Sequence, residues 1–282
     1  MTTRAVLRET AYAKLNLALH VRERMADGYH RLETLFAFCA DGDVLEAEPA
    51  DDLSLTIDGP SGEGLEIDGN LVLRAADALR THFGIERGAR LRLTKNLPVA
   101  SGIGGGSADA AAALRLLGRL WDVAIEDVQA SGIASELGAD VPACLISRTC
   151  AGSGRGDVLE EVSAPALSGK PVLLVNPRVA VSTPAIFGRW NGRDGGPLTL
   201  AEPVTPDPRW SNDLTAPATA MAPEIGEVLA WLGEQDGAEF VRMSGSGATC
   251  FALFANVAAR DAAFAMLAQN QPGWWLLPSA LR

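Results

Sequence analysis

The chain has 282 residues, 48% of them hydrophobic, which suffices for one large domain or two ordinary ones with a real core. A formal net charge of −11 argues against a nonspecific nucleic-acid surface, because neutralising a phosphate backbone takes clustered lysines and arginines. No apolar run approaches the ~20 residues of a membrane span, and the first residues lack the apolar core of a signal peptide.

The first part of the chain predicts a mixture of strands and helices. Alternating or β-branched runs predict strands at 10–22, 32–39, 43–48, 53–57 and 90–94. Apolar residues at helical spacing predict helices at 71–83, from the glycine-rich stretch to about residue 121, and at 126–137. Three further short strands are expected at 143–147, 149–152 and 157–162.

Ser163–Pro171 is rich in helix and strand breakers and is the best candidate for a boundary, which gives domains at 1–162 and 163–282. Beyond it we expect strands at 172–175, 240–243, 249–254 and 274–277, and helices at 183–190, 224–234 and 257–269. Residues 191–210 are expected to form a loop. Strands and helices are mixed and do not alternate strictly, which favours an α+β fold over a doubly wound sheet.

The cysteines and histidines show no pattern of a metal site. The four cysteines, at 39, 144, 150 and 250, form no Cys-x-x-Cys, and the histidines at 20, 30 and 82 lack the spacing of metal ligands. We therefore assign no protein metal ligands and interpret the cysteines as buried thiols in a reducing cytoplasm.

The most informative segment is a glycine-rich loop that leads into an alanine-rich helix former. Between Ser101 and Ser107 lie four glycines, at 102, 104, 105 and 106. Such a loop lets backbone N–H groups approach a phosphate, and the start of the following helix adds further N–H donors. A flexible turn is the alternative, but so many glycines are hard to explain by turning alone.

This loop fits neither of the two common phosphate motifs. No lysine follows the glycines, as a P-loop requires, and no glycine stands at 107, where a Rossmann loop would need one. The chain also lacks an early fingerprint with a ribose-binding acid, so a dinucleotide-dependent oxidoreductase is a distant alternative.

Three other motifs place polar residues in unusual settings. Lys14 and Asn16 lie on one face of an apolar strand, Asp140 stands between Gly138 and Pro142, and Asp-Gly-Tyr-His ends at His30. Each has an ordinary explanation: a solvent-facing pair on an edge strand, a turn aspartate that caps a helix, and a tight surface turn.

Together these motifs, with Pro98 before the glycines and Ser-Gly-Ser-Gly near the end, resemble the GHMP kinases, which phosphorylate small molecules. The resemblance covers roughly residues 11–278 and is weakest at 50–68 and 190–210. It implies a two-lobed fold with the active site in the cleft between lobes. Asp-Gly-Tyr-His and Leu-Gly-Ala-Asp-Val-Pro are similar to a branch that uses ATP to phosphorylate the 2-hydroxyl of a cytidine-diphosphate-linked polyol, in the non-mevalonate route to isoprenoid precursors.

The resemblance also implies roles for residues at the ATP end. Asp140 would accept the proton of the attacking hydroxyl, and Lys14 would hold Asp140 ionised and neutralise charge. Mg²⁺ would bridge the phosphates of ATP. Asn70 and Lys95 match positions near adenine and ribose. The residues expected to cradle the phosphates are Pro98, Val99, Ala100, Ser101, Gly102, Ile103, Gly104, Gly105, Gly106, Ser107 and Ala108. Ala108 replaces the second serine of many members, so Ser107 would act alone.

At the substrate end, Tyr29 and Phe187 match an aromatic pair that sandwiches cytosine, and His30 matches a group that hydrogen-bonds the base. Asn16 and Thr183 match residues that orient the rest of the substrate. Another GHMP kinase, such as a homoserine kinase, is the alternative, although its substrate has no base to stack. A non-catalytic sensor of the same fold would be expected to lack Lys14 or Asp140. We expect no nucleic-acid or membrane partner; a monomer and a weak dimer both remain open.

Overall fold

The structure, a computed structural model, describes residues 6–282 and divides into two compact units. Unit 1 comprises the described residues up to Ala13, Asp41–Val99 and Gly104–Ser147; unit 2 comprises Lys14–Ala40, Ala100–Ile103 and Arg148–Arg282. The boundary predicted at residue 162 does not coincide with this division, because the two longest strands, β1 (Leu7–Arg24) and β2 (His30–Ala50), each contribute residues to both units.

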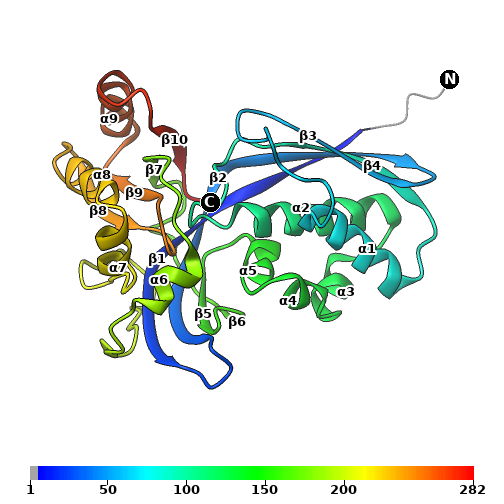
Figure 1. Ribbon diagram of the computed structural model, residues 1–282, viewed down its shortest axis with the longest axis horizontal. Helices are drawn as coiled ribbons and strands as arrows, with labels where there is room; N and C mark the ends of the chain where they lie inside the picture. The colour runs from blue at the N-terminus through cyan, green and yellow to red at the C-terminus, as the bar shows by residue number, and fades with distance from the viewer. Residues whose placement is uncertain (1–5) are drawn as a thin grey trace. The chain divides into compact units, whose positions relative to one another are not determined.

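Unit 1 combines strands with a group of helices (Figure 1). The second part of β2 pairs antiparallel with β4 (Gly88–Thr94), which pairs parallel with β3 (Leu53–Asp58). The helices are α1 (Leu71–Phe83), α2 (Gly105–Trp121), α3 (Ile125–Ala130), α4 (Ile133–Leu137) and α5 (Val141–Ile146). The alanine-rich α2 is the central helix, since its small side chains let α1 and α5 pack closely against it.

Unit 2 is built on a four-stranded antiparallel sheet in the order β10-β7-β9-β8. Its strands are β7 (Pro171–Asn176), β8 (Ala238–Met243), β9 (Cys250–Phe254) and β10 (Trp275–Ala280). The first part of β2 pairs with β5 (Cys150–Gly154), and β5 pairs with β6 (Val158–Glu161). The helices are α6 (Thr183–Gly188), α7 (Thr215–Met221), α8 (Glu224–Gly233) and α9 (Val257–Asn270).

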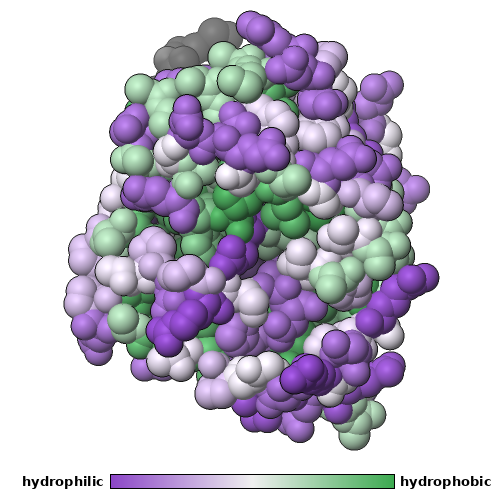
Figure 2. All heavy atoms as spheres, turned by 90° about the vertical axis from the view of Figure 1, so that its left-hand side faces the viewer, coloured by the Kyte–Doolittle hydropathy of each residue, from purple (hydrophilic) through white to green (hydrophobic). Residues whose placement is uncertain are grey.

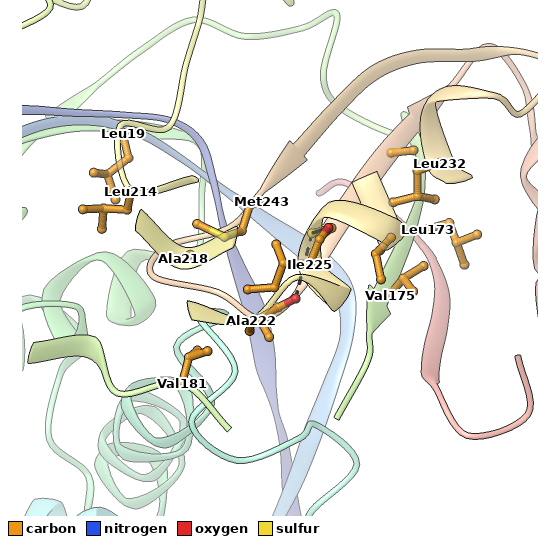
Figure 3. Close-up of a cluster of buried hydrophobic side chains, with 14 of the residues drawn as sticks. Leu19, Leu173, Val175, Val181, Leu214, Ala218, Ala222, Ile225, Leu232 and Met243 are labelled. Carbon is orange, nitrogen blue, oxygen red and sulfur yellow. Dashed lines mark hydrogen bonds between the residues drawn. The ribbon is translucent and has the colours of Figure 1, made fainter. Parts of the chain in front are cut away.

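The core of unit 2 joins this sheet to its helices. Leu173 and Val175 of β7, Ile225 of α8 and Met243 of β8 are buried in one cluster, part of which is drawn in Figure 3. Figure 2 shows the side that carries α7, α8 and α9, where hydrophilic residues surround a group of hydrophobic ones. No helix of residues 6–282 is long and apolar enough to cross a membrane.

The α+β class is confirmed, and most predicted elements form within a few residues of their expected bounds. The strand predicted at 143–147 is wrong: these residues belong to helix α5, and a short fully buried apolar run does not distinguish helix from strand by its periodicity. The helix predicted at 126–137 is broken by Gly132, which adopts a left-handed conformation with φ +79°. Helix α7 was not predicted.

One glycine of unit 1 gives a test of the fold. A Cβ on Gly42 would collide with the backbone carbonyl of Ala11, which cannot move aside as a flexible side chain would. We expect Gly42→Ala to lower the free energy of unfolding by ~1–3 kcal/mol, the usual effect of overpacking. Urea denaturation measures this, with Gly233→Ala in α8, where a Cβ meets open space, as the matched control. A Gly42→Ala protein as stable as the control would contradict this close approach.

Candidate active site

The glycine-rich loop of residues 98–108, here called the phosphate loop, adopts a backbone that needs glycine at two positions. Gly102 has φ +78° and Gly104 has φ +66°, in the left-handed region that side chains disfavour. The neighbouring Gly105 lies in the first turn of α2, where a Cβ would make only ordinary contacts. The repeated glycines therefore serve different purposes: two set the shape of the backbone and the others leave its surface bare.

The part of the phosphate loop that belongs to unit 2, residues 100–103, is fixed there by backbone contacts. The backbone N–H of Lys14 donates to the carbonyl of Ile103 at 3.0 Å, and that of Thr249 donates to the carbonyl of Ser101 at 3.1 Å. A Cβ on Gly102 would collide with the carbonyl of Ser244 and lie 2.7 Å from that of Gly247. No side chain fits between the two segments.

The second glycine loop, Ser244–Gly247, supports the first. The hydroxyl of Ser244 donates to the carbonyl of Gly102 at 3.0 Å, and a Cβ on Gly245 would lie 2.7 Å from that carbonyl. The sequence singles out this loop by its glycines but shows no partner for it. The structure identifies the partner as Gly102 of the phosphate loop.

The last part of the phosphate loop, residues 104–108, forms the N-terminus of α2 and belongs to unit 1. Gly104 is the N-cap residue and offers no side chain to the N–H groups of the first turn. These donors, with the positive end of the helix dipole, favour a bound anion. Ser107 adds a hydroxyl in the same turn.

Lys14 and Asn16 are buried and belong to one hydrogen-bond network in unit 2. Both are 3% exposed, which excludes a solvent-facing pair on an edge strand. Lys14 Nζ donates to Asn16 Oδ1 at 2.9 Å, and Asn16 Nδ2 donates to Thr34 Oγ1 at 2.8 Å. The backbone N–H of Asn16 donates to the hydroxyl of Ser244 at 3.1 Å. Asn16 thus holds the ammonium of Lys14 through its side chain and the second glycine loop through its backbone.

Asp140 lies in unit 1 at the N-cap position of α5, and it is half-buried. Its side chain makes no capping hydrogen bond to this helix, so capping does not explain the carboxylate. Pro142 in the first turn removes a backbone donor that would otherwise compete for it.

An aromatic group forms around His30 in unit 2. The rings of His30 and Phe187 have centroids 5.0 Å apart, and Trp190 meets His30 edge-on at 5.7 Å. Burial, followed by the charge of Arg24, lowers the pKa of His30 below its usual 6.5, so the imidazole is mainly neutral at pH 7. Trp190 was missed by the sequence analysis, which contains no signal that sets this tryptophan apart from the other five.

Tyr29 lies in the tight turn that the sequence offered as an alternative explanation. The backbone N–H of Tyr29 donates to Asp27 Oδ1 at 3.0 Å, and Gly28 adopts φ +88°. Tyr29 is 56% exposed, and the guanidinium carbon of Arg155 lies 5.3 Å from the centroid of its ring. An exposed aromatic side chain beside His30 is available to stack on a ligand.

Three of the remaining predicted site residues bind protein groups within their own units: Thr183, Asn70 and Lys95. The hydroxyl of Thr183 lies 2.8 Å from that of Ser246 in the second glycine loop, which joins the start of α6 to that loop. Asn70 caps α1 by accepting from the N–H of Val72 at 2.9 Å. The ammonium of Lys95 is buried between two carboxylates, so a contact with a nucleotide would fall to its backbone.

Comparison with known proteins gives the family. Residues 70–148 match the GHMP kinases N terminal domain and residues 207–272 match the GHMP kinases C terminal domain. A 4-diphosphocytidyl-2-C-methyl-D-erythritol kinase from Rhizorhabdus wittichii is 53% identical over 97% of this chain and 94% of its own. One of the same name from Sphingopyxis alaskensis is 50% identical over 99% of both chains.

Solved structures agree with this family. A crystal structure of 4-(cytidine 5'-diphospho)-2C-methyl-D-erythritol kinase superposes with a TM-score of 0.80 at 33% identity, covering 98% of this chain and 99% of that one. A homoserine kinase from Cytophaga hutchinsonii, at 17% identity and a TM-score of 0.71, shares the fold. The chain belongs to the GHMP kinase family, whose members are ATP-dependent small-molecule kinases.

Proposed function

We propose that the protein transfers the γ-phosphoryl group of ATP to the 2-hydroxyl of 4-diphosphocytidyl-2-C-methyl-D-erythritol, a step in the non-mevalonate route to isoprenoid precursors. One observation carries the proposal: the backbone N–H of Lys14 donates a hydrogen bond to the carbonyl of Ile103, so a residue with a buried ammonium is fixed to the loop that is proposed to bind the phosphates. The full-length relatives of that name support the choice of substrate.

Asp140 is proposed as the general base and Lys14 as its electrostatic partner. A half-buried carboxylate can accept the proton of the 2-hydroxyl as that oxygen attacks phosphorus. An ammonium favours the ionised form of a nearby carboxylate and offsets negative charge on the oxygens of the transferred group. Asn16 holds the Lys14 side chain in one orientation, which lowers the entropy lost on reaching the transition state.

The triphosphate is proposed to lie against the backbone N–H groups of residues 101–107, at the start of α2. No group of three His, Cys, Asp or Glu side chains suited to a metal ion exists in residues 6–282. Mg²⁺ fits this site as an ion that arrives with ATP, because it keeps several waters and binds mainly through phosphates. The hydroxyl of Ser107 is the group that the protein is proposed to offer to this ion, and the ion would neutralise charge on the phosphates of ATP.

The aromatic group around His30 supports a cytidine ligand over an amino acid or a simple sugar. Tyr29 and Phe187 are proposed to stack on the base, and the neutral His30 can exchange hydrogen bonds with its edge. Asn16 and Thr183 are proposed to orient the diphosphate and the polyol. Homoserine has no base that would use these rings, which separates the two candidate kinases.

The reaction is proposed to take place in the cytoplasm. All four cysteines are buried free thiols, as the sequence predicted, which suits a reducing compartment.

A coupled assay of ADP release tests the function directly. We expect turnover with 4-diphosphocytidyl-2-C-methyl-D-erythritol and ATP, and a much lower kcat/KM with homoserine or mevalonate. Equal use of homoserine would overturn the substrate assignment but leave the kinase assignment intact. Loss of ADP release with all three would overturn both.

Replacing the proposed base tests the chemistry. Asp140→Asn keeps the shape but cannot accept a proton, so we expect kcat to fall ~10²–10⁴-fold while ATP binding is retained. Glu136→Gln, which removes an exposed carboxylate from the neighbouring helix α4, is the matched control and should retain full activity. A rate for Asp140→Asn above half that of the wild type, measured under conditions in which chemistry limits, would exclude Asp140 as the base.

Adding a methyl group to the phosphate loop tests the binding of ATP. Gly102→Ala forces a collision with the backbone of the second glycine loop and a strained φ, so the loop must shift. We expect the KM for ATP to rise about tenfold or more, whereas Gly233→Ala leaves it unchanged. Steady-state kinetics at saturating second substrate measures this; a wild-type KM for ATP would show that the loop does not bind the nucleotide.

Removing the aromatic rings tests the cytidine site. We expect Tyr29→Ala and Phe187→Ala each to weaken the cytidyl substrate by ~1–3 kcal/mol without changing the KM for ATP. Because both rings are proposed to stack on one base, the double variant should lose less than the sum of the two. Thermal melts must accompany the kinetics, since Phe187 also packs against the core of unit 2. Strict additivity, or an equal loss for ATP, would contradict a shared sandwich.

A further inference from the structure

A buried ion cluster lies beside the phosphate loop in unit 1. Lys95 Nζ is 2.5 Å from Asp43 Oδ2 and 2.7 Å from Asp109 Oδ2. The side chains of Lys95, Asp43 and Asp109 are 4%, 0% and 6% exposed. Removing three charged groups from water is costly even when they are paired, so a cluster of this kind is a poor device for stability alone.

At the entry to the loop, Asp43 holds the backbone. Its Oδ1 accepts from the N–H of Asn96 at 2.5 Å and from that of Leu97 at 2.8 Å, immediately before Pro98. Lys95 is itself fixed to β3, because its N–H donates to the carbonyl of Asp58 at 2.8 Å. These two hydrogen bonds fasten the backbone immediately before the loop to Asp43.

At the exit from the loop, Asp109 holds the start of α2. A Cβ placed on Gly105, the first residue of this helix, would lie 3.5 Å from Lys95 Nζ and 4.0 Å from Asp43 Oδ2. The ammonium thus lies directly against the helix start while it binds Asp109 in the second turn. One cation joins the segment before the loop to the segment after it.

We propose that Asp43, Lys95 and Asp109 are positioning residues that hold both ends of the phosphate loop, so that the N–H groups at the start of α2 are set in advance for the triphosphate of ATP. The inference rests on the proposed function, which supplies the nucleotide. Preorganised donors bind a ligand more tightly because the loop loses little entropy on binding.

The charge of the cluster gives the proposal a second consequence. Burial raises the pKa of Asp109 to about 7; Lys95 opposes this shift and Asp43 adds to it. Of the helices packed on α2, α1 buries Val72, Ala75, Ala76 and Leu79, and α5 has no charged residue. The smaller helices α3 and α4 carry the carboxylates of Glu126, Asp127 and Glu136, all of them exposed. Asp109 Oδ1 has no hydrogen-bond partner among residues 6–282 and can carry the proton. As Asp109 loses this proton, the cluster gains a negative charge near the phosphates.

Binding measurements on the full chain test the positioning role. In calorimetry without the second substrate, we expect Asp109→Ala to weaken ATP about tenfold and to change the affinity for cytidine 5'-diphosphate less than about twofold. Asp109→Asn keeps an oxygen that accepts from Lys95 and should restore ATP affinity to within about threefold. Unchanged ATP affinity in Asp109→Ala, or an equal loss for both ligands, would overturn the inference.

Glu9→Ala is the matched control, because it removes a partly buried carboxylate that pairs with Arg115 and Arg119 of the same helix. We expect it to lower the melting temperature and leave ATP affinity unchanged. An ATP affinity that falls in Glu9→Ala as much as in Asp109→Ala would show that any destabilised α2 binds poorly, which would overturn the inference.

The pH dependence decides the matter if Asp109→Ala does not fold. We expect the ratio of the ATP dissociation constant of the wild type to that of Asp109→Asn to rise about threefold from pH 6 to pH 8.5, since only the wild type gains a charge. The ratio cancels the titration of ATP itself. A flat ratio would overturn the inference. Wild-type protein that fails to bind ATP at all would instead overturn the proposed function.

The free energy of unfolding should also depend on the titration of Asp109, and it should fall as the pH rises. An acid whose folded pKa is raised stabilises the protein fully below its unfolded pKa of about 4, and this contribution is lost as the pH rises through about 7. Asp109→Asn should therefore gain melting temperature relative to the wild type across this range. A purely structural cluster would show this gain but not the change in the ATP ratio.

Discussion

The shape of the phosphate loop is the constraint on which the rest of the site depends. Its residues 100–103 are fixed in unit 2, where there is no room for a side chain on Gly102 against Ser244 and Gly247. Its last residues form the N-terminus of α2 in unit 1, which has no side-chain cap. A loop fixed in this way presents its N–H groups without reorganisation, which is what transfer of a phosphoryl group requires of a protein.

The proposed catalytic groups share the contacts that hold this loop. The backbone of Lys14 binds the phosphate loop, and its side chain binds Asn16. The backbone of Asn16 in turn binds Ser244 of the second glycine loop. Thr183 reaches the same second loop through Ser246. A change at any of these positions would therefore disturb the contacts of both glycine loops, which gives the polar residues in an otherwise apolar stretch of β1 a role within one hydrogen-bond network.

Much of this could be predicted from the sequence, because the signals are local. The glycines, the alanine-rich α2 and the isolated polar residues of β1 each stand out within a few positions. The three-way contact of Asp43, Lys95 and Asp109 could not be predicted, since its members come from β2, from the segment after β4 and from α2, and each looks ordinary alone. Trp190 escaped for the same reason. The strand expected at 143–147 failed because a short buried run carries no period, and the boundary near 162 failed to match because β1 and β2 pass through both units.

A crystal structure with a non-hydrolysable analogue of ATP tests the central claim most directly. The account predicts that the β- and γ-phosphates lie within hydrogen-bond distance of backbone N–H groups between Ser101 and Ser107, with Gly102 and Gly104 in the conformations described here. A triphosphate bound away from these N–H groups, or a loop that must refold to reach it, would contradict it.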